Sequence, residues 1–140
     1  MKALAERRGR IARVRQVQHL QAAGEAATAD AKVDQLEGNA ARLAALRMSL
    51  AMAPGLTSGA ALGNSAELGL RLDHVRNGLA DAIGAARNVA ELRAGERLEA
   101  HIKREGAERL ETRAVAELQQ MIEDRMAASI RHRAKETRNG

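Results

Sequence analysis

The residues of this chain with the clearest binding chemistry are arginines close to its start. Five arginines occur within nine positions: Arg7, Arg8, Arg10, Arg13 and Arg15. Guanidinium groups form strong, charge-assisted hydrogen bonds with carboxylates and phosphates. A cluster of this kind is therefore suited to bind an acidic protein surface or the backbone of a nucleic acid. A second basic segment lies near the end of the chain and contains Arg131, Arg133 and Lys135.

Both ends of the chain are basic and the middle is mildly acidic. With 23 Lys and Arg against 18 Asp and Glu, the formal net charge is +5. Residues 1–20 contribute +5 and residues 125–140 contribute +4, which leaves −4 for residues 21–124. Because the chain has no Phe, Tyr or Trp, it has no platform for base stacking. Non-specific contact with nucleic-acid phosphates is therefore the weaker hypothesis, and two solvated tails that bind nothing are the other alternative.

Patterns typical of catalysis or metal binding do not occur in the sequence. The four histidines are scattered, and only Glu105, one turn from His101, offers a second ligand, whereas a zinc site needs three or four. Ser58 lies in GLTSG, which is not a G-x-S-x-G nucleophile motif, and the sequence has no G-x-x-x-x-G-K-[ST] phosphate loop. The sequence therefore predicts a non-enzymatic protein without a cofactor, a metal site or a small-molecule substrate.

The arginines are expected to lie on long helices. The composition is rich in Ala, Leu, Glu and Arg, which is typical of coiled coils, and it has no aromatic residue with which to fill a compact core. The absence of Cys fits a reducing compartment. Pro54 and three glycines interrupt the helical pattern in MAPGLTSGAALGNS, residues 52–65. We predict an all-α fold in which two long helices form an antiparallel coiled-coil hairpin. The hairpin is a single domain over 1–140, with helix one at about 2–52, a loop at 53–64, Asn64 as the N-cap, and helix two at about 65–136.

Apolar residues at alternating spacings of four and three predict the seam along which the helices meet. In helix one these residues are Ala29, Val33, Leu36, Ala40, Leu43, Arg47 and Leu50, and towards the start the frame continues through Ala26, Ala22, His19, Arg15, Ala12 and Arg8. In helix two they are Leu68, Leu72, Val75, Leu79, Ala82, Ala86 and Val89, and towards the end the frame continues through Arg93, Glu96, Ala100, Lys103, Ala107 and Leu110. Such spacing specifies a left-handed coiled coil. We expect the half next to the loop to be better packed, because alanines and charged residues occupy the seam near the termini.

Helix two is expected to be longer than helix one by roughly twenty residues. Its end carries an apolar stripe one position out of the earlier frame, formed by Val115, Leu118, Ile122, Met126 and Ser129. Two interpretations remain open: the stripe binds an external partner, or a one-residue stutter lets helix two curve back onto helix one. Leu118 and Ile122 are therefore candidate partner-binding residues, together with Arg131 and Arg133.

Several features resemble the FliJ family, small coiled-coil proteins of the bacterial flagellar type III export apparatus. They are the pattern IARVRQVQHLQAA, the chain length, the two-helix layout with an Ala-rich first helix, and the Arg-rich tail. The stretch MIEDRMAASIRHR departs from the Glu- and Lys-rich ending of that family.

The resemblance implies the central stalk of a hexameric export ATPase. Such a stalk links the ATPase ring to the export gate in the membrane and interacts with export chaperones, and its N-terminal arginines dock on these partners. The resemblance also implies a cytoplasmic protein, peripherally associated with the inner membrane, that hydrolyses no ATP itself. A coiled-coil scaffold or adaptor unconnected with secretion, and an injectisome stalk, are the alternatives.

Overall fold

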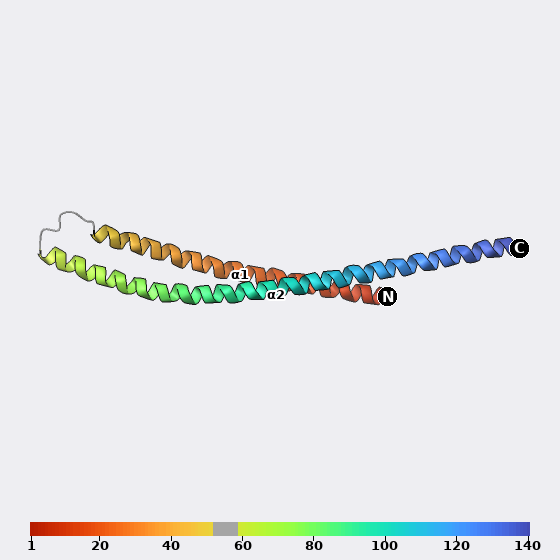
Figure 1. Ribbon diagram of the computed structural model, residues 1–140, viewed down its shortest axis with the longest axis horizontal. Helices are drawn as coiled ribbons and strands as arrows, with labels where there is room; N and C mark the ends of the chain where they lie inside the picture. Colours follow the sequence, from red (N-terminus) through yellow and green to blue (C-terminus); the bar gives the residue numbers. More distant parts are fainter. Residues whose placement is uncertain (52–58) are drawn as a thin grey trace. The chain divides into compact units, whose positions relative to one another are not determined.

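Two antiparallel helices account for almost all residues whose structure is described. The computed structural model describes residues 1–51 and 59–140, with α1 at Lys2–Ala51 and α2 at Gly59–Asn139 (Figure 1). These described residues contain no β-strand, and α1 and α2 pack against each other as a helical hairpin. The predicted all-α hairpin is thus confirmed.

The second helix begins earlier than the sequence predicted. The expected loop reached residue 64, with Asn64 as the N-cap, but the chain is helical from Gly59 onwards. Ala60 and Ala61 have the highest helix propensity of all residue types, and a helical glycine such as Gly63 costs only about 1 kcal/mol relative to Ala. The rest of the predicted loop, with Ser58 and the expected end of helix one at residue 52, lies outside the described residues.

The helices contribute to two compact units, which are described separately. Unit 1 consists of Met1–Ala22 and Arg97–Gly140, and unit 2 consists of Ala23–Glu96. In unit 1, Gln16 contacts Arg104 and His19 contacts His101, so the numbers of facing residues add up to 120. In unit 2 the ion pairs Glu25–Arg93, Glu37–Arg87 and Arg47–Asp73 have numbers that add up to 118, 124 and 120. In unit 1 the start of α1 therefore lies level with about residue 118 of α2.

The predicted seam of α1 is confirmed along its whole length. Every predicted position from Arg8 to Leu50 is buried or half-buried. Val14, Val17 and Leu20, which lie outside the predicted frame, are 55–63 % exposed.

The predicted seam of α2 is correct at one of its two heptad positions and, except at half-buried Glu96, wrong at the other. Leu72, Leu79 and Ala86 are half-buried as predicted, but Leu68, Val75 and Val89 are 47–51 % exposed. The second position of the seam is instead one residue later along the chain and is occupied by Gly69, Ile83 and Ala90. Arg76 and Arg97 are exposed at this position, and beyond Arg97 the same heptad continues through Arg104, Ala107, Glu111, Ala114, Leu118 and Met121. The proposed one-residue stutter is therefore unnecessary, because the apparent change of frame came from the wrong second position.

The most deeply buried apolar side chains are all alanines. Four of them belong to unit 1, namely Ala5, Ala12, Ala107 and Ala114, and Ala26 belongs to unit 2. Small side chains allow two helices to approach closely, so alanine fills the space between them almost completely. The seam leucines of unit 2 remain half-buried. Deeply buried alanines are thus more numerous in unit 1. The expectation that the half next to the loop is better packed stays a prediction, because a half-buried leucine can bury as much apolar area as a buried alanine.

Candidate partner-binding surfaces

The N-terminal arginines lie on unit 1, where α1 runs beside α2. Arg7, Arg10 and Arg13 are exposed, whereas Arg8 and Arg15 are half-buried in the seam. None of the five guanidinium groups forms an ion pair with a carboxylate of residues 1–51 or 59–140. Arg15 donates a hydrogen bond from Nη1 to Oε1 of Gln18 at 3.0 Å, which leaves its charge uncompensated. The positive charge of this segment is thus available to a partner.

The facing segment of α2 has a different charge arrangement. Its residues 97–118 contain five basic and five acidic residues, so their net charge is zero. Most of these cations pair with a carboxylate one turn further along or back, as in Lys103–Glu99 at 3.3 Å and Arg113–Glu117 at 3.2 Å. Exposed pairs of this kind stabilise a fold by about 1 kcal/mol at most, so their main effect is on charge. Where the two helices run side by side in unit 1, the excess positive charge therefore lies on α1.

A close approach of the two helices occurs beneath this basic segment. Gly9 is buried, and a Cβ atom at its position would lie 3.1 Å from Oε1 of Glu111 and 3.7 Å from Nη1 of Arg13. The missing side chain leaves room for the Glu111 carboxylate in the seam. An open groove beside it is lined by Glu6, Arg10, Arg13 and Glu111, among others.

A layer of polar side chains interrupts the alanine seam of unit 1. The rings of His19 and His101 lie with their centroids 5.4 Å apart. His101 approaches Glu105 through Nε2 at 3.2 Å and Nη2 of Arg104 through Nδ1 at 3.1 Å. Arg104 also donates from Nη1 to Oε1 of Gln16 at 3.4 Å. The layer therefore links both helices through side chains that can change charge.

Two nitrogen atoms of this layer are shielded from solvent and have no hydrogen-bond partner among the described residues: Nδ1 of His19 and Nε of Arg104. Burial lowers the pKa of His19 below its ordinary value of 6.5, and the positive charges of Arg104, His101 and Arg97 lower this pKa further. Glu108 opposes this shift more weakly. The folded state consequently favours neutral His19. The sequence analysis placed His19 in the seam but did not anticipate its contact with His101, because the frame of α2 was wrong there.

The end of α2 extends beyond the start of α1 within unit 1 (Figure 1). Leu118 and Met121 are half-buried, whereas every residue from 122 onwards is exposed. The exposed fractions of Ile122, Met126 and Ile130 are 42 %, 61 % and 64 %. The apolar stripe therefore faces no other helix within unit 1, and the alternative in which helix two curves back onto helix one is not observed there.

The two basic segments are not brought together. Arg7 lies level with about residue 113 of α2, and Arg131 lies 18 positions further along that helix. At 1.5 Å per residue this separation is ~27 Å along the axis. Arg131 and Arg133 are exposed at this distant site. The N-terminal arginines and the C-terminal basic segment are therefore separate candidate surfaces.

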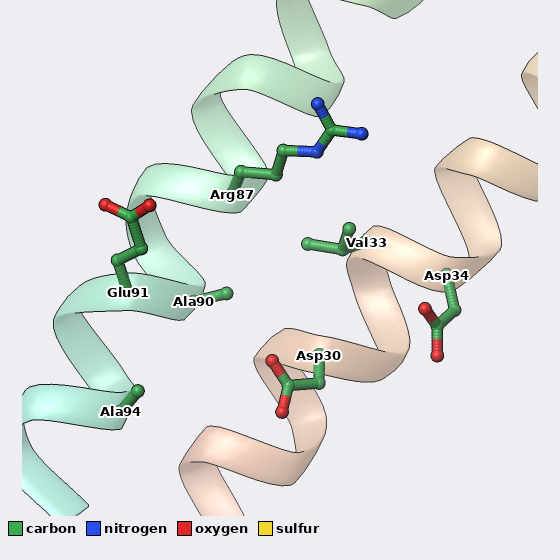
Figure 2. Close-up of a pocket in the computed structure, with 7 residues that line it drawn as sticks. All are labelled: Asp30, Val33, Asp34, Arg87, Ala90, Glu91 and Ala94. Carbon is green, nitrogen blue, oxygen red and sulfur yellow. The ribbon is translucent and has the colours of Figure 1, made fainter.

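An open groove in unit 2 is lined mainly by acidic residues and alanines. Figure 2 shows Val33 of α1 and Ala90 of α2 pointing toward each other, with the carboxylates of Asp30, Asp34 and Glu91 around them. Arg87, also at this groove, donates from Nε to Oε1 of Glu37 at 3.2 Å. Across residues 1–51 and 59–140, no three His, Cys, Asp or Glu side chains are grouped so as to hold a metal ion. The groove is thus a surface feature of the coiled coil and supplies no ligand set for a metal.

Neither helix in the described ranges contains a stretch that is long and apolar enough to cross a membrane.

Comparisons with known proteins add no relative. No model of a known protein family matches the chain, and no curated protein or solved structure is similar to it. The resemblance to FliJ therefore rests on the sequence features alone.

Proposed function

We propose that this chain is a non-enzymatic coiled-coil linker that docks on partner proteins through the N-terminal arginines of α1. The observation that supports this proposal is the set of arginines in unit 1 without carboxylate partners among the described residues. In the specific form of the proposal, the chain is the stalk of a flagellar type III export apparatus. Its partners are then a hexameric export ATPase, the export gate at the inner membrane and export chaperones, all met from the cytoplasm.

The charge arrangement favours docking by the exposed arginines. Arg7, Arg10 and Arg13 can bind carboxylates of a partner without breaking an ion pair within the described residues. Charge-assisted hydrogen bonds are stronger than neutral ones, and complementary charge accelerates encounter between proteins. In this proposal the ring hydrolyses ATP, and the hairpin supplies contacts only.

The experiment compares two charge reversals of equal size. The test variant combines Arg7→Glu, Arg10→Glu and Arg13→Glu, and the control combines Lys32→Glu, Arg42→Glu and Arg71→Glu, which are exposed residues of unit 2. Both variants keep their helicity, because Arg and Glu have similar helix propensities. We expect the test variant to lose binding to the ATPase ring and stimulation of its ATP hydrolysis at least tenfold, while the control retains both. Equal behaviour of the two variants would refute docking through the arginines.

The same pair of variants separates the alternatives. An adaptor outside secretion would bind no export ATPase but would bind another acidic protein. The test variant would lose that binding, and the control variant would keep it. A nucleic-acid-binding protein would instead show duplex affinity that falls steeply with salt and is reduced in the test variant.

A further inference from the structure

The end of α2 is a helix whose apolar side chains lack a partner within unit 1. We call residues 122–139 the C-terminal overhang, since the start of α1 lies level with about residue 118 and all residues of this segment are exposed. Its stripe continues the buried seam, because Leu118 is half-buried and Ile122, four positions on, is 42 % exposed. An interface between two helices therefore already exists at the base of the overhang and is bounded there by the first residues of α1.

The stripe is symmetric in its spacing. Apolar residues recur every four positions at Leu118, Ile122, Met126, Ile130 and Ala134. Rows of side chains four apart form the ridges that most often interdigitate when two helices pack. Because Ile122 and Ile130 lie at equal distances on either side of Met126, an antiparallel copy of the same helix places isoleucine against isoleucine and methionine against methionine. The stripe is thus complementary to itself.

Charge is distributed along this helix in two blocks of opposite sign. Residues 117–124 contain Glu117, Glu123 and Asp124 and no basic residue, a net charge of −3. Residues 125–139 contain Arg125, Arg131, Arg133, Lys135 and Arg138 against Glu136 alone, a net charge of +4. In an antiparallel pair, the acidic block of one copy lies beside the basic block of the other. A parallel pair would place like charges together, and charges within ~10 Å still interact at 0.1 M salt.

We propose that the C-terminal overhangs of two copies of this chain pair antiparallel about a two-fold axis at Met126, forming a dimer. The contact is isologous, so each copy uses the same stripe. Each copy contributes one short helical segment to the interface, so we expect a weak dimer with a dissociation constant on the order of 100 µM. Arg125 lies next to the axis and approaches Arg125 of the second copy, which weakens the dimer.

Sedimentation equilibrium of the full chain tests the pairing. The mass of the unmodified chain rises from the 15.0 kDa of the monomer toward twice that value as the concentration approaches ~1 mM. The variant with Ile122→Glu and Met126→Glu stays monomeric at the same helicity. The control with Leu98→Glu and Ile102→Glu, whose native side chains are 60 % and 61 % exposed, still forms the dimer. The variant Arg125→Gln dimerises several-fold more tightly.

Cysteine cross-linking tests the orientation, since the chain has no native cysteine. A disulfide forms only when the two Cα atoms are about 4.4–6.8 Å apart. A mixture of the Ile122→Cys and Ile130→Cys variants should therefore form cross-linked heterodimers, whereas Ile122→Cys alone should not cross-link. Cross-linking of Ile122→Cys with itself would indicate parallel pairing and overturn the proposal. A chain that remains monomeric to ~1 mM, or a dimer that survives Ile122→Glu with Met126→Glu, would overturn it as well.

Discussion

His19 is a residue whose environment could be understood only from the folded chain. Its ring faces His101 of α2, and Arg104, Arg97 and Glu108 are close enough to change its pKa. Three of these neighbours are positive or can become positive, so a proton on His19 meets repulsion from the opposite helix. This layer is consequently a weak point in the contact between α1 and α2 when the pH falls.

Unit 1 should lose stability in mild acid because of His19. Folding lowers the pKa of His19 below 6.5, so the folded state favours the neutral ring. The associated stabilisation is fully present above the unfolded-state pKa and is lost as the pH falls through the folded-state pKa. We expect the variant His19→Gln to show less loss of unfolding free energy between pH 7.5 and 5 than the unmodified chain, measured by urea denaturation. His74→Gln, at an exposed position of unit 2, is the control and should change this pH dependence little.

At the scale of the elements, the two helices differ in how strictly their sequence defines the seam. In α1 the residues directly before and after most seam residues are polar or exposed, so only one set of positions is suited to the seam. In α2 the alternatives stand side by side: Leu68 precedes Gly69, and Ala82 precedes Ile83. Which residue of each adjacent pair is buried depends on the side of α2 that α1 covers.

Two leucines of α2 should differ in their contribution to stability. Leu72→Ala removes a half-buried side chain from the seam and should lower the unfolding free energy by about 1–2 kcal/mol, part of the 2–5 kcal/mol of a fully buried site. Leu68→Ala changes a side chain that is 47 % exposed and should cost about 0.5 kcal/mol or less. Urea denaturation followed by circular dichroism measures both values. If both variants lost the same amount of unfolding free energy, both leucines would belong to the seam, as the sequence predicted.

Glycines of α2 provide a second test at this scale. A Cβ atom at Gly95 or Gly106 would meet no atom within 4 Å, so Gly→Ala there should stabilise the chain by about 0.5–1 kcal/mol through helix propensity alone. At Gly69 a Cβ atom would lie 2.8 Å from Nη1 of Arg47, which hydrogen-bonds Asp73 through Nε at 3.3 Å. Gly69→Ala must displace this guanidinium group and should gain little or nothing. Thermal unfolding of the three single variants compares them directly, and an equal gain at Gly69 would show that Arg47 moves at no cost.

At the scale of the whole molecule, our proposals place binding in segments other than those that hold the two helices together. The buried alanines and the ion pairs between α1 and α2 lie within the paired parts of the two units. The exposed arginines of α1 form no ion pair among the described residues, and the apolar stripe of the C-terminal overhang faces no other helix within unit 1. Changes in these binding segments should therefore alter association more than folding.

Removal of the overhang should leave the unfolding free energy nearly unchanged. Deleting residues 122–140 takes away only exposed residues, so we expect a change within about 0.5 kcal/mol at low protein concentration. Deletion from residue 108 onwards also removes Glu111, Ala114, Leu118 and Met121 from the seam and should destabilise unit 1 clearly. In the intact chain, amide hydrogens of residues 122–139 should exchange faster than those of 100–121, because unpacked helix opens locally at little cost. Strong protection of the overhang in a dilute monomer would contradict this assignment.

The sequence by itself determined the two helices, the seam of α1 and the unequal helix lengths. These features follow from composition and from a local 3.5-residue period, which each helix carries without reference to the other. Tertiary structure alone decided the second seam position of α2 and the contact of His19 with His101, whereas the seam of α1 already separated Arg8 and Arg15 from the exposed Arg7, Arg10 and Arg13. The physical reason is that burial depends on both helices together. Where small or apolar residues are adjacent in α2, either can enter the seam, and the rotation and register of α1 select one of them.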